Sequence, residues 1–244
     1  MLECFSRYVY ISHPKVLVVD RELALLKAIQ KVFPESAIIV CVWHIQEKLL
    51  AKCKEARLDD EAKDDFMKSW NNIIEQPTEE LFNARLRDLE DKYNSTAAGS
   101  EVITYLHDTW LPYKHYFSHP WTNKCTHFGE LASSRSEGGH YTIKSWIKQS
   151  TSDLLVAVDR IELALKQQHR DIHQKIAEER QSIAHIYNTP LYTQLVCKIS
   201  KFALSFLHQQ YSYAIRPPTG DPVLDQCTGV FTKTMGLPCW HTIR

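Results

Sequence analysis

Asp20 and Glu137 are the two acidic residues whose local sequence points to chemistry. Asp20 directly follows the apolar run 16–19, and open α/β sheets bind their ligands beyond the carboxyl ends of parallel strands. Asp is also a favoured N-cap residue, so capping of a helix that starts at Arg21 explains its presence equally well. Glu137 lies at the start of a predicted helix, where an acid stabilises the helix macrodipole. The residues alone leave both interpretations open.

The residues around Glu137 suit contact with a phosphate backbone. A Gly-Gly pair follows Glu137 directly, and paired glycines at a helix start cost stability unless something must approach closely. His140 and Lys144 lie one and two turns beyond Glu137, on the same face of the predicted helix. We therefore consider His140 and Lys144, together with the neighbouring Arg135, candidate DNA contacts.

Cys41 and His44 form a Cys-x-x-His pair at the end of a second apolar run, residues 37–42. Cys and His at this spacing can bind zinc, although one such pair is weak evidence for a site. A buried Cys beside a hydrogen-bonded His is an equally good explanation. A Cys–His nucleophile pair would need an orienting Asn or Asp, and the sequence identifies none. Both residues are also candidate DNA contacts.

The C-terminal segment DQCTGVFTKTMGLPCWHTIR offers a stronger zinc pattern. Asp225 and Cys227 form one close pair and Cys239 and His241 a second, about a dozen residues later. Each pair can occupy two corners of a tetrahedron from one tight turn. Asp225 is a permissible oxygen ligand but an uncommon one in structural zinc sites.

Bulk composition describes an ordinary globular protein without a strongly basic character. The 244 residues carry a formal net charge of zero and are 44% hydrophobic and 24% charged, so total charge does not indicate a nucleic-acid binder. The start of the sequence lacks a secretory signal, and no apolar stretch approaches the roughly 20 residues that span a bilayer. The seven cysteines are therefore expected to be reduced thiols or metal ligands in an intracellular protein.

The elements that must position these residues are expected to be mostly helical. The chain has only seven glycines and long stretches without Gly or Pro, which favours helices. Two apolar runs, 14–20 and 37–42, flank a helical pattern and predict a βαβ unit with parallel strands. Further helices are predicted over 48–54, 64–74, 78–93 and 101–106, then an irregular stretch over 112–136, one long helix from Glu137 to about Ile186 and another after Pro190.

Two predicted helices carry apolar residues at helical spacing on one face, and the stripe on the long helix is predicted to be buried. The charge run 57–65 is predicted to be a solvated face or a helix start. The long helix carries the apolar stripe Leu154, Val158, Ile161, Leu165, Ile172 and Ile176, and the helix after Pro190 carries Leu195, Ile199, Phe202 and Phe206.

Four blocks in order resemble the transposase domain of Mutator-like elements, the MULE transposases. PKVLVVDRELALLKAIQKVFP resembles the segment with the family's second catalytic Asp, and IIVCVWHIQEKLLAKCK its Cys-x-x-His segment. HFGELASSRSEGGHYTIK resembles the block with the catalytic Glu, and DQCTGVFTKTMGLPCWH the SWIM-type zinc finger that often follows. The blocks cover most of the chain, and their order, with the gap from Asp20 to Glu137, carries the resemblance.

The resemblance implies an α/β fold with large helical content, in which an all-helical insertion interrupts a partial RNase H-like core. On this basis we expect a partial core (βαβ) in residues 1–45 and the helical insertion in 46–116. The chain would return to the core, with the Glu-bearing helix, in residues 117–186. A helical connector (187–222) and a truncated SWIM-like zinc finger (223–244) would complete it.

The resemblance also implies the chemistry. Asp20 and Glu137 would be the second and third members of an Asp-Asp-Glu triad that holds two Mg²⁺ or Mn²⁺ ions. Two such metals activate a water or a 3′-hydroxyl and stabilise the leaving oxygen during attack on a phosphodiester. The zinc finger would use Asp225, in place of the first Cys, with Cys227, Cys239 and His241.

The sequence departs from the family pattern at its two ends. The first Asp should lie on an earlier strand, yet the only acid before Asp20 is Glu3, and the sequence stops three residues after His241. We therefore expect a fragment truncated at both ends, with an exposed sheet edge and without catalytic activity.

Two other functions remain open. One is a domesticated nuclear DNA-binding or transcription-regulatory protein without catalysis, whose partners would be DNA (transposon terminal repeats or a promoter element) and a second copy in a homo-oligomer. The other is an unrelated helical interaction protein in which Asp20 and Glu137 only cap helices.

Overall fold

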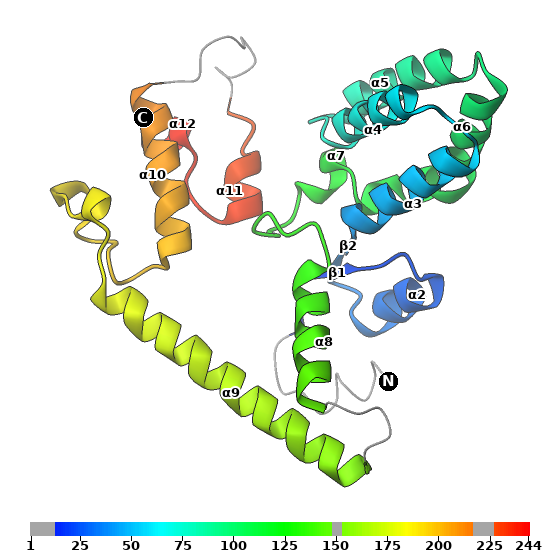
Figure 1. The fold of residues 1–244 in the computed structure, drawn as a ribbon. Helices are drawn as coiled ribbons and strands as arrows, with labels where there is room; N and C mark the ends of the chain where they lie inside the picture. Colours follow the sequence, from blue (N-terminus) through cyan, green and yellow to red (C-terminus); the bar gives the residue numbers. More distant parts are fainter. Residues whose placement is uncertain (1–12, 148–152, 217–226) are drawn as a thin grey trace. The chain divides into compact units, whose positions relative to one another are not determined.

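The computed structural model describes residues 13–147, 153–216 and 227–244. These residues form two units, whose elements are labelled in Figure 1. The first unit extends through Ser133 and includes Lys233–Gly236, and the second comprises Ser134–Thr232 and Leu237–Arg244. No helix in the described ranges is long and apolar enough to cross a membrane.

The chain begins with the predicted βαβ unit, formed by β1 (Val16–Val19), α2 (Leu23–Val32) and β2 (Ala37–Val40). The two strands pair in parallel along their whole length, with Val19 opposite Val40. β2 is mostly buried, whereas all of β1 is half-buried, less than expected for a strand covered on both faces. The described residues contain this two-stranded sheet and no other. They confirm an α/β fold with large helical content, while the RNase H-like core stays a proposal.

The N-cap of α2 differs from the prediction. Glu22 caps the helix, because its carboxylate accepts hydrogen bonds from the backbone N–H groups of Ala24 (3.3 Å) and Leu25 (2.8 Å). The helix begins at Leu23, two residues later than expected. The interpretation of Asp20 as the helix cap is therefore wrong, and its carboxylate is available for other contacts.

Four helices of 13 to 15 residues follow β2 in the first unit (Figure 1). They are α3 (Val42–Glu55), α4 (Asp60–Ile74), α5 (Glu79–Tyr93) and α6 (Ala97–Thr109). Asp59, Thr78 and Thr96 cap the last three, each accepting a hydrogen bond from a first-turn N–H group. The charge run 57–65 therefore contains a helix start, as predicted, and α3 and α6 begin earlier than expected.

The helices of the first unit share one core with the βαβ unit. Its largest fully buried side chains include Phe66, Trp70 and Phe82. The 3₁₀-helix η1 (Leu111–Tyr116) and the short helix α7 (His119–Thr122) close this core, and the rest of the stretch expected to be irregular has no regular structure up to α8. This packed core is what supports the end of the small sheet.

The long helix predicted from Glu137 is two helices, α8 (Ser134–Ile147) and α9 (Leu154–Gln181). Asp153 has an extended backbone and caps α9 by accepting a hydrogen bond from Leu155 N–H. The prediction of a single continuous helix is therefore wrong, because Asp153 caps the start of a second helix.

The apolar stripe on α9 is exposed. Leu154, Val158, Leu165, Ile172 and Ile176 have exposed fractions between 42% and 78%, which contradicts their predicted burial, while the sixth residue of the stripe, Ile161, is half-buried. The buried residue of α9 is Ala164, which lies about 100° around the helix from Leu165. Ile161 lies one turn before Ala164 on the packed side of α9, and the exposed residues of the stripe lie away from that side.

The remainder of the second unit comprises η2 (His185–Tyr187), η3 (Pro190–Tyr192), α10 (Lys201–Ile215), α11 (Val230–Met235), whose last three residues belong to the first unit, and α12 (Trp240–Ile243). Because α10 begins at Lys201, Leu195 and Ile199 precede the helix and pack against a small cluster of Tyr187, Tyr192 and Leu204. Phe202 is exposed. The predicted common face of that helix is therefore wrong.

Candidate metal centres

Three potential ligands meet where the two parallel strands end, and we call Asp20, Cys41 and His44 the strand-end cluster. Asp20 follows β1, and Cys41 follows β2 and stands at the N-cap of α3. The parallel register brings these two residues together, and Cys41 N–H donates to Val19 O at 2.8 Å. His44 lies in the first turn of α3, so a single helical turn presents both members of the Cys-x-x-His pair.

The side chains of the strand-end cluster lie in direct contact. His44 Nδ1 and Asp20 Oδ1 are 2.7 Å apart, and one donor atom from each residue lies within 4.8 Å of the others. Cys41 is buried, His44 is half-buried and the Asp20 carboxylate is exposed. The cluster therefore has one side in the core and one side open to solvent.

Ser133 completes the strand-end cluster from a distant part of the sequence. Its hydroxyl donates to Asp20 Oδ1 at 3.3 Å, and its backbone N–H donates to Cys41 Sγ at 3.3 Å. Two residues earlier, Leu131 O accepts a hydrogen bond from Val42 N–H at 3.0 Å. The sequence carried no signal for Ser133, because it is 92 residues from Cys41 and 113 from Asp20.

The geometry argues against a nucleophile at this cluster. Asp20 is the orienting acid that the sequence did not identify, but Cys41 is fully buried. Ser133 Oγ lies 3.5 Å from His44 Nδ1, the same ring nitrogen that contacts Asp20. A catalytic triad needs the acid on one ring nitrogen and the nucleophile on the other. Metal binding is the chemistry that these three donors support.

Glu137 and three of the candidate DNA contacts lie on α8 in the second unit, whereas the other two, Cys41 and His44, lie at the start of α3 in the first unit. Arg135, Glu137, His140 and Lys144 are exposed, and α8 has no buried residue. A side-chain carbon built at Gly138 or Gly139 would meet no atom of the described residues within 4 Å. The two glycines thus leave open space beside α8 at the positions where side chains would stand. A joint metal site of Asp20 and Glu137 stays a prediction.

A second set of potential ligands, Cys227, Cys239 and His241, gathers in the second unit, and we call it the tail cluster. Its donor atoms also lie within 4.8 Å of one another. The two sulfurs are 3.5 Å apart, too far for a disulfide of about 2.05 Å. Tetrahedral zinc with Zn–S bonds of about 2.3 Å places two sulfurs roughly 3.8 Å apart. The described members of the predicted zinc pattern are thus together, while Asp225 lies outside the described residues.

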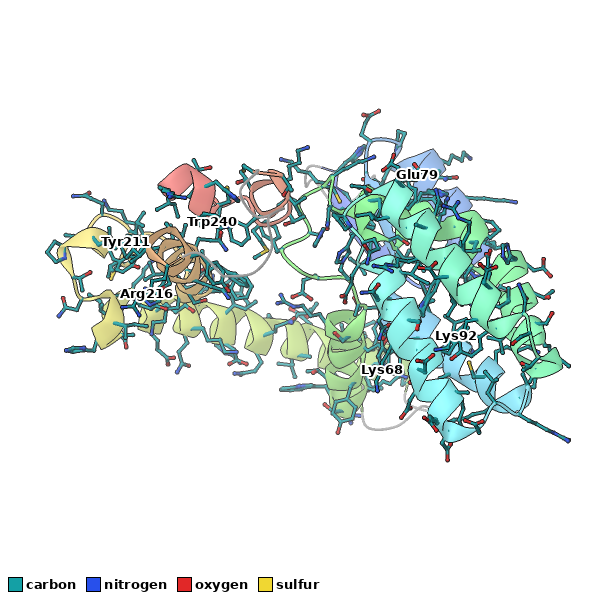
Figure 2. The ribbon with its side chains drawn as sticks, turned by 90° about the horizontal axis from the view of Figure 1, so that it is seen from above. Lys68, Glu79, Lys92, Tyr211, Arg216 and Trp240 are labelled. Atoms are coloured by element: carbon teal, nitrogen blue, oxygen red, sulfur yellow. The ribbon has the colours of Figure 1, made fainter. Side chains whose placement is uncertain are left out.

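Short elements support the tail cluster. Cys239 is the N-cap residue of α12, and the His241 ring stacks on Trp240 with 3.7 Å between centroids. Trp240 is buried, and its backbone N–H donates to Gln210 Oε1 of α10 at 2.9 Å. In Figure 2, Trp240 lies in the same region as Tyr211 of α10. The hydrogen bond between Trp240 and Gln210 holds α12 against α10.

The Cys239 thiol is set up to ionise readily. Burial raises its pKa, but hydrogen bonds with Thr242 and then with Cys227 and His241 outweigh burial and lower the pKa to about 6. Cys239 Sγ lies 3.3 Å from Thr242 Oγ1. A thiolate is the form in which cysteine binds metal ions, so this environment favours metal binding.

Two cavities lie away from these clusters. One of about 350 Å³ lies between α4 and α5 beside Lys68, Arg85 and Lys92, two of which are labelled in Figure 2. Asp88 contacts Arg85 and Asp65 contacts Lys92, which offsets two of the three positive charges. The other, of about 370 Å³, is apolar and lies beside Tyr192, Tyr211 and Ile243. Neither is lined by the candidate catalytic, metal-binding or DNA-binding residues predicted from the sequence.

Comparison with known protein families finds a match in the first part of the chain. Residues 1–48 match the MULE transposase domain. The matched MULE segment contains β1, α2 and β2 and all three residues of the strand-end cluster. The resemblance seen in the sequence is thus confirmed for this segment, while the SWIM-type finger is not matched.

A second comparison finds similarity to a much longer protein. The chain is 22% identical over 267 aligned residues to the PKS-NRPS hybrid synthetase cheA of Chaetomium globosum. The alignment covers 96% of this chain but only 6% of that protein, so the name describes functions that the aligned part need not share. No solved structure matches the chain.

Proposed function

We propose that this chain derives from a Mutator-like DNA transposase and does not cleave DNA by itself. The observation that carries the proposal is Asp20, an exposed carboxylate at the carboxyl end of a parallel strand inside the MULE segment. That is where open α/β sheets place their ligands. The RNase H-like core, with 46–116 as its helical insertion, is part of this proposal.

The donor set argues against catalysis by this chain. Two-metal phosphodiester chemistry uses Mg²⁺ or Mn²⁺ ions held by carboxylates, and Mg²⁺ requires near-octahedral oxygen ligands. The strand-end cluster offers a single carboxylate beside a thiol and an imidazole. Asp20 and Glu137 are the residues that we propose for the ancestral Mg²⁺ site.

A nuclease assay tests the proposal. The purified chain is incubated with Mg²⁺ or Mn²⁺ and a supercoiled plasmid that carries Mutator-like terminal repeats. We expect neither nicking nor linearisation above the background of a Glu137→Gln variant. Metal-dependent cleavage that Glu137→Gln abolishes would contradict the absence of activity.

A second candidate is a nuclear DNA-binding or regulatory protein, and the exposed face of α8 favours it. His140 and Lys144 are exposed near the open glycine pair, and Arg135 is exposed on the same helix. Binding through phosphates weakens as salt rises, because counterions are released. A gel-shift series across salt with terminal-repeat and promoter DNA tests this function, with Lys144→Ala and Lys68→Ala as a matched pair. Binding that is independent of salt, or equally weakened in both variants, would argue against α8 as the contact.

The tail cluster supports a separate proposal, a SWIM-type zinc site. Cys227, Cys239 and His241 provide three ligands, and Asp225 is the proposed fourth. A site with three N and S donors suits zinc, because zinc prefers Cys and His in tetrahedral geometry. Metal analysis of the purified chain and of Cys239→Ser tests it.

A further inference from the structure

We propose that the strand-end cluster binds zinc rather than magnesium, with Asp20, Cys41 and His44 as its three protein ligands. The inference shares Asp20 with the proposed function but does not depend on DNA binding or cleavage. Thiolate and imidazole are ligands that select zinc and similar transition ions, whereas Mg²⁺ selects oxygen. Two of the three donors here are therefore poor ligands for the ion that the transposase reaction uses.

The backbone brings the three donors to zinc-binding separations. Bonds of about 2.0–2.3 Å to a tetrahedral zinc place neighbouring ligand atoms roughly 3.2–3.8 Å apart. The donor atoms of the cluster already lie within 4.8 Å of one another, and two of them are 2.7 Å apart. Side-chain rotations that move the donor atoms by about an ångström are therefore sufficient to reach these separations. Zinc would take the place of the hydrogen between His44 Nδ1 and Asp20 Oδ1.

The surroundings of Cys41 suit an anionic ligand. Cys41 stands at the start of α3, where the positive end of the helix macrodipole favours negative charge. Its sulfur accepts a hydrogen bond from Ser133 N–H at 3.3 Å. The side chain is fully buried, so its position is fixed by packing before a metal arrives.

Ser133 acts as the outer partner that orients the ligands. It contacts Asp20 through its hydroxyl and Cys41 through its backbone N–H. Such partners fix the orientation of metal ligands and are part of most protein metal sites. Val42 N–H, next to Cys41, holds the same segment through Leu131 O at 3.0 Å.

The open side of the cluster leaves room for a fourth ligand. The Asp20 side chain is 56% exposed and that of His44 is 29% exposed, whereas Cys41 faces the core. Three protein ligands with an accessible fourth position are the pattern of reactive zinc sites, and four protein ligands are the pattern of structural ones. Water is the expected fourth ligand at this position.

Cobalt titration of the full chain tests the site. Cys239→Ser serves as the background, because it removes a ligand of the tail cluster. In that background we expect Co²⁺ to give a sulfur-to-cobalt charge-transfer band and intense visible bands, and Zn²⁺ to displace it. Adding Cys41→Ser should abolish the charge-transfer band. Adding Asp20→Asn or His44→Gln should weaken zinc by more than about 100-fold, because losing even an outer partner costs about 10–100-fold.

Cys53→Ser is the matched control, because Cys53 is also a buried thiol on α3 and lies outside both clusters. It should leave the cobalt spectrum unchanged. Asp20→Asn replaces an exposed carboxylate, so it keeps the test valid if Cys41→Ser fails to fold.

The zinc proposal is overturned if the Cys239→Ser chain binds Zn²⁺ no more tightly than Mg²⁺. It is also overturned if Asp20→Asn binds zinc as tightly as the background does. Failure of the proposed function would look different, because DNA cleavage by a chain that binds zinc at these residues contradicts only the absence of activity.

Discussion

The strand-end cluster and the tail cluster contain similar donors on very different supports. Each combines a buried Cys, a half-buried His and one exposed ligand, which is Asp20 in the first and Cys227 in the second. The strand-end cluster stands on a sheet end and a 14-residue helix that share one large core. The tail cluster stands on a four-residue helix fixed to α10 by Trp240. We infer that the first is shaped before metal binds and the second depends on metal for its order.

The largest expected effect is loss of the tail structure without zinc. Structural zinc contributes apparent binding energies of about 10–16 kcal/mol in zinc-finger peptides, and four-residue helices have little stability of their own. Cys239→Ser or chelation should remove hydrogen-exchange protection from residues 239–244 while the amides of α3–α6 keep theirs. Equal protection of residues 239–244 with and without zinc would show that the tail, like the strand-end cluster, is shaped without metal.

Truncation of a core side chain in the first unit should destabilise that unit and leave the tail cluster unchanged, the opposite of zinc removal from the tail. Trp70 is fully buried in the first unit, so Trp70→Ala should cost about 3–5 kcal/mol of unfolding free energy. Zinc affinity at the strand-end cluster should fall in Trp70→Ala, while zinc affinity at the tail cluster is unchanged. Leu165→Ala on the exposed stripe of α9 is the control and should change stability by no more than about 0.5 kcal/mol. Denaturant unfolding measures the free energy of unfolding of both variants, and zinc analysis measures the metal that each retains. An equal loss of unfolding free energy in Trp70→Ala and Leu165→Ala would contradict the exposure of the stripe.

Ser133→Ala should have an intermediate effect that is confined to the strand-end cluster. It removes the hydroxyl hydrogen bond to Asp20 and keeps the backbone bond to Cys41. We expect zinc affinity there to fall about 10-fold, at the lower end of outer-partner effects, with the tail cluster unchanged. Ser134→Ala is the neighbouring control, and an equal effect of the two variants would exclude an orienting role for Ser133.

Some of this arrangement is local and was predictable from the sequence. The βαβ unit and the helices of the first unit follow from short-range apolar spacing and caps such as Asp59. The cap at Asp153 was also present in the sequence, but the periodic apolar residues across 137–186 concealed it. Periodicity gives the side of a helix that is apolar and does not give what covers it, which is why the exposed stripe of α9 was mispredicted.

The candidate sites were predictable to different depths. Cys41–His44 and Cys239–His241 are each close in sequence, so their pairing required only one helical turn. For Asp20 the sequence left helix capping and a ligand role equally open, because Asp is a good cap residue, and the structure gives the cap to Glu22. Ser133 could not be found, because a contact across 92 residues depends on the tertiary fold.

The smallest expected effect is that of Asp65, a carboxylate at the surface of the first unit. It tests whether low pH destabilises the first unit through a group that belongs to neither cluster. Hydrogen bonds from Lys92 and then from Tyr93 lower the pKa of Asp65 below its usual value. A lowered carboxyl pKa stabilises the fold above about pH 4, and this contribution is lost as pH falls through the lowered pKa. Asp65→Asn should cost no more than about 1 kcal/mol, because the pair is largely exposed. Unfolding at pH 7 and pH 3 measures it, and an equal cost at both would contradict this cause.

The most direct test of the two-cluster account is the number of zinc ions bound per chain, counted by native mass spectrometry. We predict two zinc ions for the wild-type chain, one for each cluster. Cys41→Ser and Cys239→Ser should each retain one, and the double variant none. A wild-type chain with a single zinc that disappears in Cys239→Ser and persists in Cys41→Ser would contradict the account.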